Sequence, residues 1–166
     1  MDIQLHPIQN EDAQVLMELN NSREIAQYVV GNPTVVNIEQ QLNWIRKTAD
    51  EKNTKRWMIY ADGQPVGTIF ISSIDIANGV GNVNIKLLPN YQGKGIAKQA
   101  VTLLRDIAFD ELDLYCLTAK ILPYNIKSIM LFVKSGFHVD GLLRKQVVKN
   151  GGRYDLLALS LLKEER

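Results

Sequence analysis

Hydrophobic and polar positions change period several times along this chain of 166 residues. Apolar and polar residues alternate at 3–7, which predicts a strand. Helical spacing follows, with apolar faces around Leu16 and Leu42. Asn37, with Gln40 three residues later, is typical of a helix start closed by a capping box. The first third of the chain is therefore expected to form a strand followed by helices.

Strand periodicity takes over from Arg56. The pairs Asp62-Gly63 and Asn78-Gly79 predict two hairpin turns, because these dipeptides readily adopt the positive φ angles that such turns need. The strand after the second turn shows a regular alternation between its two faces. One face carries Val83, Ile85 and Leu87, and the other carries Asn82, Asn84 and Lys86.

This strand stops at Pro89, and a turn that contains Gly93 and Gly95 leads into a new helical pattern from Ile96. Backbone N–H groups at a helix start have no intrahelical partner and lie at the positive end of the helix dipole. Glycine leaves room for a ligand to approach the backbone closely. The segment therefore predicts a binding site for a phosphate group.

Two familiar phosphate-binding loops do not fit the spacing of this turn. A Walker A loop needs G-x-x-x-x-G-K-[ST], which the turn lacks, and the dinucleotide fingerprint needs a third glycine where Lys98 stands. The pattern that remains is Q-x-x-G-x-A, from Gln92 through Gly95 to Ala97. On these residues alone, an ordinary turn between a strand and a helix is the alternative interpretation.

A second pattern lies at 125–137 and fits N-x-x-[SA]-x-x-L-[YF]-x-x-x-G-F. Asn125 is a good N-cap, apolar residues then follow at helical spacing, and Gly136 is placed to end the helix in a left-handed conformation. Together with the Q-x-x-G-x-A turn, this segment resembles the GNAT superfamily of N-acetyltransferases. The resemblance extends from Asp2 to about Leu162.

The resemblance implies a single GNAT domain over residues 1–166 with an α+β fold. Its sheet would be mixed and mostly antiparallel, with helices on both faces. In that family the strand before the acyl-CoA loop and the strand after its helix splay apart, and the pantetheine arm lies in the resulting cleft. The second of these strands is expected here at 112–120.

The resemblance also implies that an acetyl group passes from acetyl-CoA directly to a primary amine. The strand backbone before the turn would pair with the pantetheine amides, and the N–H groups of the turn would hold the pyrophosphate. Asn125 is a further candidate for a cofactor contact. The residues so assigned to cofactor binding are Ile85, Lys86, Leu87, Gln92, Gly93, Lys94, Gly95, Ile96, Ala97, Lys98 and Asn125.

Two proton transfers need candidates. Many GNAT enzymes use a glutamate on the strand before the loop as the base, but this strand has none. Asp75 is the nearest acidic candidate, with a turn role for Asp75 and bulk water as the base left open. Many members protonate the leaving thiolate with a tyrosine at the position where Phe132 stands here. Ser128, one helical turn earlier, is therefore the candidate acid, and its alternative role is a hydrogen bond to the helix backbone.

Composition limits the classes of partner that this protein is expected to bind. Nineteen basic and eighteen acidic residues give a net charge of +1, which carries no signature of nucleic-acid or membrane binding. Basic residues between Arg144 and Arg153, among them Lys149, are expected to form solvated surface. The single cysteine, Cys116, is expected to act as a small buried hydrophobe, and no metal-ligand spacing is present. We expect a cytoplasmic enzyme that uses acetyl-CoA and an amine without a metal, with a homodimer left open.

The identity of the amine stays open in the sequence. The segments 19–23 and 136–155 are similar to acetyltransferases of polyamines and of ribosomal-protein N-termini. The later segment is also similar to acetyltransferases of nucleotide-linked amino sugars. The absence of a net acidic charge argues mildly against a polyamine. Phe132 and the missing strand glutamate keep one alternative open, a non-catalytic acyl-CoA-binding module.

Overall fold

One seven-stranded sheet runs through the computed structural model, which describes all residues from Met1 to Arg166. The strand order is β1-β2-β3-β4-β5-β7-β6, and every neighbouring pair is antiparallel except β4 and β5. The strands are β1 (Ile3–Pro7), β2 (Lys55–Ala61), β3 (Gln64–Asp75), β4 (Val80–Leu87), β5 (Cys116–Ile121), β6 (His138–Lys149) and β7 (Gly152–Leu162).

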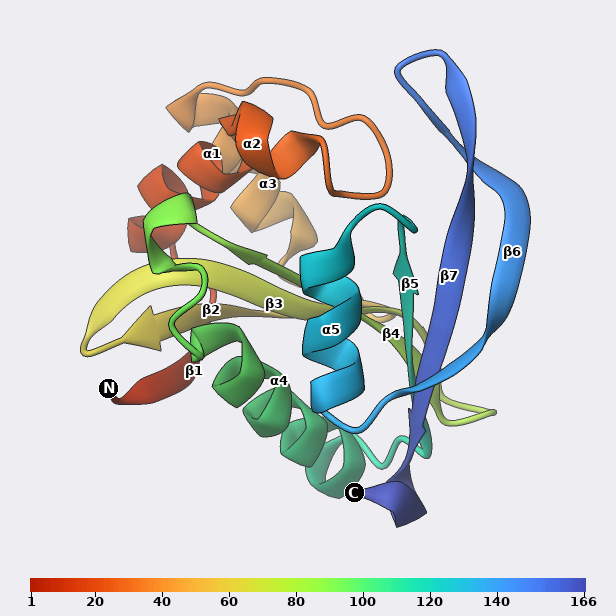
Figure 1. The fold of residues 1–166 in the computed structure, drawn as a ribbon. Coiled ribbons are helices and arrows are strands. Elements are labelled where there is room, and N and C mark those ends of the chain that lie inside the picture. Colours follow the sequence, from red (N-terminus) through yellow and green to blue (C-terminus); the bar gives the residue numbers. More distant parts are fainter.

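Five α-helices cover the two faces of this sheet. They are α1 (Ala13–Asn21), α2 (Arg23–Ala26), α3 (Ile38–Thr48), α4 (Ile96–Asp106) and α5 (Ile126–Lys134). In Figure 1, α4 and α5 lie in front of the sheet, while α1 to α3 gather at its upper end. The expected α+β class, with a mixed sheet and helices on both faces, is confirmed.

The main core lies between the sheet and the pair α4 and α5. Ile69, Val83 and Leu117 from the strands pack there with Leu104 from α4 and Phe132 from α5, and all five are buried. A smaller core on the opposite face joins residues of α1, α3 and β2, among them Leu16, Ile45 and Met58. The alternation of apolar and polar residues along β4 therefore separates a face that packs on α4 from a face that α4 does not cover.

The parallel pairing of β4 with β5 follows from the crossover through α4, since parallel neighbours cannot be joined by a tight turn. This crossover contains an element that sequence periodicity did not predict. A π-helical turn, Ile107–Glu111, extends α4, and β5 begins only at Cys116. The expectation of a strand from residue 112 was wrong at its start, because Leu112 and Leu114 are apolar at strand spacing but lie in the connection, where Leu114 is buried.

The turn signals in the sequence are confirmed. Asn37 and Gln40 form the expected capping box at the start of α3. Hairpin turns follow β2 at Asp62-Gly63 and β3 at Asn78-Gly79. None of the helices is both long and apolar enough to cross a lipid bilayer.

Candidate active site

The pairing between β4 and β5 is short. Only Val80 to Asn82 of β4 pair with Cys116 to Thr118 of β5, whereas β5 pairs with β7 over its whole length. The two strands therefore separate after Asn82, and the remainder of β4 up to Leu87 has no strand partner on that side. Ile85, Lys86 and Leu87, for which the GNAT resemblance implies pantetheine binding, all lie in this unpaired part. A free strand edge of this kind can pair with the amides of an extended ligand.

The turn between β4 and α4 presents free backbone donors. The N–H groups of Gly93, Lys94 and Gly95 donate to no carbonyl or side chain of the protein. The Gly95 carbonyl accepts from the N–H of Gln99, in the first turn of α4, at 3.3 Å. The first N–H groups of α4, from Ile96 to Lys98, also lack intrahelical partners. The turn thus places consecutive N–H groups at the positive end of an 11-residue helix.

Both glycines of the turn have left-handed backbones, with φ angles of 75° at Gly93 and 80° at Gly95. A Cβ atom built at either position would have no heavy atom within 4 Å. The backbone conformation therefore favours glycine here, and the space beside the turn is open to a ligand. Free donors, open space and the helix dipole together fit a diphosphate such as that of coenzyme A.

Two side chains shape this turn. Gln92 turns back and its Nε2 donates to the Leu87 carbonyl at 3.1 Å, which ties the turn to the end of β4. The ammonium of Lys94 lies 5.6 Å from the centre of the Tyr91 ring, and Lys98 is exposed on the first turn of α4. The side chain of Ile96 is fully buried, so only its backbone faces a ligand.

The start of α5 holds the candidate acid. Asn125 caps the helix, since its Oδ1 accepts from the Ser128 N–H at 3.2 Å, and its Nδ2 donates to the Tyr28 carbonyl at 3.3 Å. The carboxamide of Asn125 is therefore used within the chain. The hydroxyl of Ser128 is half-buried and forms no hydrogen bond to the helix backbone, unlike that of Ser135, which donates to the Leu131 carbonyl at 2.8 Å.

Phe132 lies one turn further along α5 and is only 2% exposed. Its ring meets that of Phe137 edge to face, with the ring centres 4.9 Å apart. The side chain at this position is thus part of the apolar core. Ser128 lies one turn before Phe132 on the same side of α5, and its hydroxyl is free, whereas that of Ser135 is bonded to the helix backbone.

Asp75 lies at the end of β3, in the hairpin that precedes β4. Its two carboxylate oxygens accept from the backbone N–H of Asn78 at 3.1 Å and from the Asn78 side chain at 2.7 Å, and these hydrogen bonds lower the pKa of Asp75. Asp75 pairs with Val80, so the length of β4, roughly 20 Å, separates it from Leu87. This geometry favours the turn role of Asp75 over the role of a base.

The face of β3, β4 and β5 that α4 does not cover carries a polar network. Asn84 Nδ2 donates to Ser72 Oγ at 3.0 Å, and Thr118 Oγ1 donates to Asn82 Oδ1 at 3.2 Å. These side chains bridge the three strands where β4 and β5 begin to separate. Sequence periodicity placed Asn82 and Asn84 on one face but could not pair them with residues of β3 and β5.

Two segments that are distant in sequence form walls beyond the carboxyl end of β5, at the end where β4 and β5 have separated. The connection between α2 and α3 reaches towards the long β6–β7 hairpin, which is visible in Figure 1. Lys149 at the end of β6 donates to three carbonyls of this region, those of Ala26 at 2.6 Å, Val29 at 2.9 Å and Gly31 at 2.8 Å. Lys149 is only 3% exposed, so the expectation of solvated surface was wrong for this residue. Burial lowers the pKa of Lys149, while the three carbonyls offset the loss of water around its ammonium.

Three tyrosines also join the α2–α3 connection to the β6–β7 hairpin. Tyr124, at the start of the connection into α5, lies with its ring centre 6.1 Å from that of Tyr28 and 5.9 Å from that of Tyr154. Its hydroxyl donates to the Gln27 carbonyl at 2.6 Å. The start of α5, the α2–α3 connection and β7 are thereby held together, and no local signal in the sequence indicates this contact.

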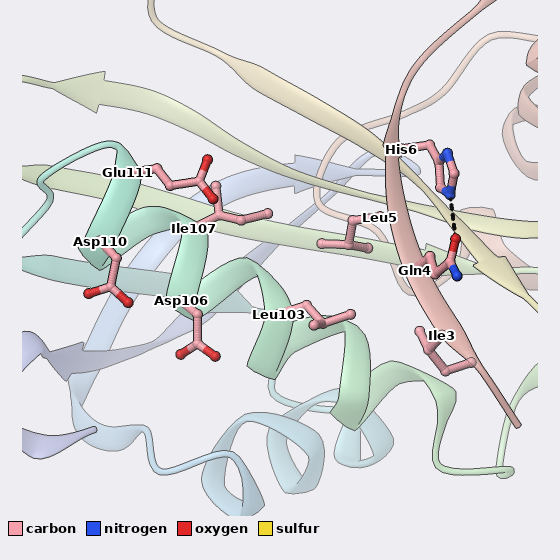
Figure 2. A pocket seen from close by; sticks show the side chains of 9 residues that line it. All are labelled: Ile3, Gln4, Leu5, His6, Leu103, Asp106, Ile107, Asp110 and Glu111. Carbon is pink, nitrogen blue, oxygen red and sulfur yellow. Dashed lines mark hydrogen bonds between the residues drawn. The ribbon is translucent and has the colours of Figure 1, made fainter.

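A separate groove of about 580 Å³ lies at the β1 edge of the sheet, between β1 and α4. Figure 2 shows Leu5, Leu103 and Ile107 facing one another inside it, while the carboxylates of Asp106 and Asp110 point away. Arg166 contacts both of these carboxylates. The groove is lined by β1 and by the C-terminal part of α4 with the turn after it, so it does not include the helix start where consecutive free N–H groups lie. Nowhere in the protein do three or more His, Cys, Asp or Glu side chains come together as ligands for a metal ion.

Comparison with known proteins agrees with this geometry. Residues 2–138 match the family model described as an acetyltransferase (GNAT) domain. An uncharacterized N-acetyltransferase from Bacillus licheniformis is 32% identical over 97% of this chain and 93% of its own length. The spermidine N(1)-acetyltransferase of Escherichia coli K12 is 28% identical over 90% of this chain and 80% of its own length. A putative ribosomal N-acetyltransferase from Bacillus subtilis is 28% identical over 98% and 92%.

The fold also matches a solved structure. Spermidine N-acetyltransferase from Vibrio cholerae, in complex with CoA and spermine, superposes with a TM-score of 0.90 at 22% identity over 98% of this chain and 96% of that one. The matches to the family model and to the B. licheniformis relative are matches of sequence, and the superposition shows that the folds agree as well. The chain therefore belongs to the GNAT acetyltransferase family and is an acetyl-CoA-dependent enzyme that transfers an acetyl group to a primary amine.

Proposed function

We propose that acetyl-CoA lies along the free edge of β4, and that the amine acceptor reaches the thioester from the face that α4 does not cover. The observation that carries this proposal is the separation of β4 from β5 directly before a turn of free N–H groups. In this arrangement Gly93 to Lys98 hold the diphosphate, and the backbone from Ile85 to Leu87 pairs with the pantetheine arm. α4 starts at the turn and packs on one face, which leaves the opposite face to the acceptor.

The acceptor must lose a proton before it attacks. A lysine-like amine has a pKa of about 10.4, so most of it is protonated at neutral pH. β4 offers no carboxylate, and Asp75 is held in its turn. We therefore assign the proton to water, which the polar lining of Ser72, Asn82 and Asn84 can bind beside the cleft.

The amine nitrogen then forms a bond to the acetyl carbon, and the bond from carbon to sulfur breaks. A backbone N–H near Leu87 stabilises the negative charge on the carbonyl oxygen during this step. The leaving thiolate takes a proton from the Ser128 hydroxyl, directly or through water, and solvent returns that proton. The free state of the Ser128 hydroxyl supports this role, because a hydroxyl bonded to the helix backbone would be less available.

A thiol-release assay tests the proposal. Purified protein with acetyl-CoA is expected to release CoA only when a primary amine is added, across a panel of polyamines, α-amino peptides, amino sugars and small amino acids. Polyamine acetylation is the second candidate function, since the E. coli relative and the V. cholerae structure carry that name. A protein that binds CoA by calorimetry but releases no thiol with any of these amines would instead be a non-catalytic acyl-CoA-binding module.

A further inference from the structure

One charged side chain points into the acceptor face without a partner. Lys86 lies between Ile85 and Leu87 in the part of β4 that has separated from β5. Leu87 and Val83 are buried against α4, so the alternation of the strand places the Lys86 side chain on the opposite face. Its antiparallel neighbour there is Thr68 of β3.

The ammonium of Lys86 has no counter-charge. The side chain is half-buried, yet it takes part in none of the seven ion pairs and donates no hydrogen bond to the chain. Burial lowers the pKa of Lys86, and no neighbouring carboxylate counters this effect. Lys149, the other lysine with a lowered pKa, differs because three carbonyls surround its ammonium. A charge that is partly removed from water is normally paired, so the unpaired ammonium of Lys86 is a candidate for a ligand contact.

The surrounding strands add to the positive charge. Lys120 stands two residues after Thr118 on β5, on the same face as Asn82 and Lys86. Neither β4 nor β5 contains an aspartate or a glutamate. The two strands that border the cleft therefore contribute two lysines and no acidic side chain. A polyamine would bring further ammonium groups towards this lining, whereas an acceptor with a negative group would supply the missing counter-charge.

We propose that Lys86 is a specificity residue that binds an anionic group of the acceptor, a carboxylate or a phosphate a few bonds from the reacting amine. The acceptor is then a small acidic amine. This inference rests on the proposed function, because it concerns the second substrate of the same cleft.

Matched pairs of acceptors test the role of Lys86. In each pair, kcat/KM is compared between an amine that carries a negative group and its neutral counterpart. Phosphoethanolamine against ethanolamine and glucosamine 6-phosphate against glucosamine examine phosphate, and β-alanine against propylamine examines carboxylate. The wild type is expected to favour at least one anionic member over its neutral partner and over spermidine. Lys86→Met should lower kcat/KM for that anionic acceptor about 10- to 100-fold, as expected for loss of a charge-assisted hydrogen bond, with little change for its neutral partner.

Lys86→Glu sharpens the test, because it should shift the preference towards spermidine. Lys47→Met, which removes an exposed charge on α3, is the control and should leave the ratio unchanged. CoA affinity by calorimetry should be the same in all variants, which shows that the β4 backbone is intact. A wild type that favours spermidine, or a Lys86→Met variant with an unchanged ratio, overturns the inference but leaves the proposed function standing. Absence of thiol release with every amine overturns the proposed function itself.

Discussion

The turn before α4 and the acceptor face of the cleft differ in the atoms from which they are built. The turn offers consecutive backbone N–H groups from Gly93 onwards, supplied by one short stretch of chain. The acceptor face is made of side chains, and its walls join segments that are far apart in sequence, since Lys149 and Ala26 are 123 positions apart. A backbone site depends on local conformation alone, whereas a side-chain site changes whenever any of its distant contributors changes. A family can therefore share the cofactor half while the acceptor half differs from member to member.

The strongest way to break this comparison is to fill the backbone site. Gly95→Glu should lower the affinity for CoA more than 100-fold, because the new side chain occupies the diphosphate position and repels its charge. The fold should survive, since a Cβ at Gly95 meets no atom within 4 Å and the left-handed backbone costs about 1–2 kcal/mol. Calorimetry with CoA gives the answer.

The control is Gly63→Glu, at a hairpin glycine with nearly the same φ of 79° and an equally open Cβ. It carries the same backbone strain away from the turn and should bind CoA as the wild type does. Equal CoA affinity in folded Gly95→Glu and Gly63→Glu variants would show that the diphosphate lies elsewhere.

The second prediction concerns the wall of the acceptor half. Lys149→Met should reduce the free energy of unfolding by about 1–3 kcal/mol, because three carbonyls lose their donor. It should also raise KM for the acceptor while the Kd of CoA stays constant. Chemical denaturation and steady-state kinetics measure the two effects.

Lys163→Met serves as the comparison, since Lys163 pairs with the exposed Asp113 and such surface pairs contribute roughly 0–1 kcal/mol. If Lys149→Met destabilises no more than Lys163→Met, the three carbonyl contacts do not hold the wall in place. If it changes CoA affinity as strongly as acceptor KM, the two halves of the site are not independent.

The smallest effect is expected where the two halves meet, at Ser128. A positioned acid typically contributes ~10²–10⁴-fold, and a thiol with a pKa near ~8.5 needs such help least. Ser128→Ala should therefore lower kcat about tenfold or less, with CoA affinity unchanged. Ser135→Ala, which removes a hydroxyl bonded to the helix backbone, should leave kcat unaltered. Identical kcat values for the two variants at every pH would assign the protonation of the thiolate to solvent.

Local chemistry explains which features the sequence could predict. The capping box at Asn37, the hairpin at Asp62-Gly63 and the left-handed end of α5 at Gly136 all depend on neighbouring residues, and all are confirmed. The start of β5 was misplaced because apolar residues at 112–115 fit a strand and a buried connection equally well.

The acceptor face escaped prediction for a different reason. Lys149 stands among basic residues that favour a solvated surface, and only the fold brings the carbonyls of the α2–α3 connection around it. The unpaired state of Lys86 is equally invisible in the sequence, because it depends on where the fold places the carboxylates of other elements relative to its ammonium. Contacts between segments about 100 residues apart carry no local pattern.

The contact between Lys149 and the α2–α3 connection also bears on how this enzyme can change over generations. The ammonium binds the main-chain carbonyls of Ala26, Val29 and Gly31 and makes no use of their side chains. Apart from Gly31, whose left-handed backbone favours glycine, side chains along this stretch can therefore be exchanged without loss of these hydrogen bonds, provided that the backbone keeps its course. A single lysine thus lets the wall beside the acceptor acquire new side chains, and with them new substrates, while its position in the fold is preserved.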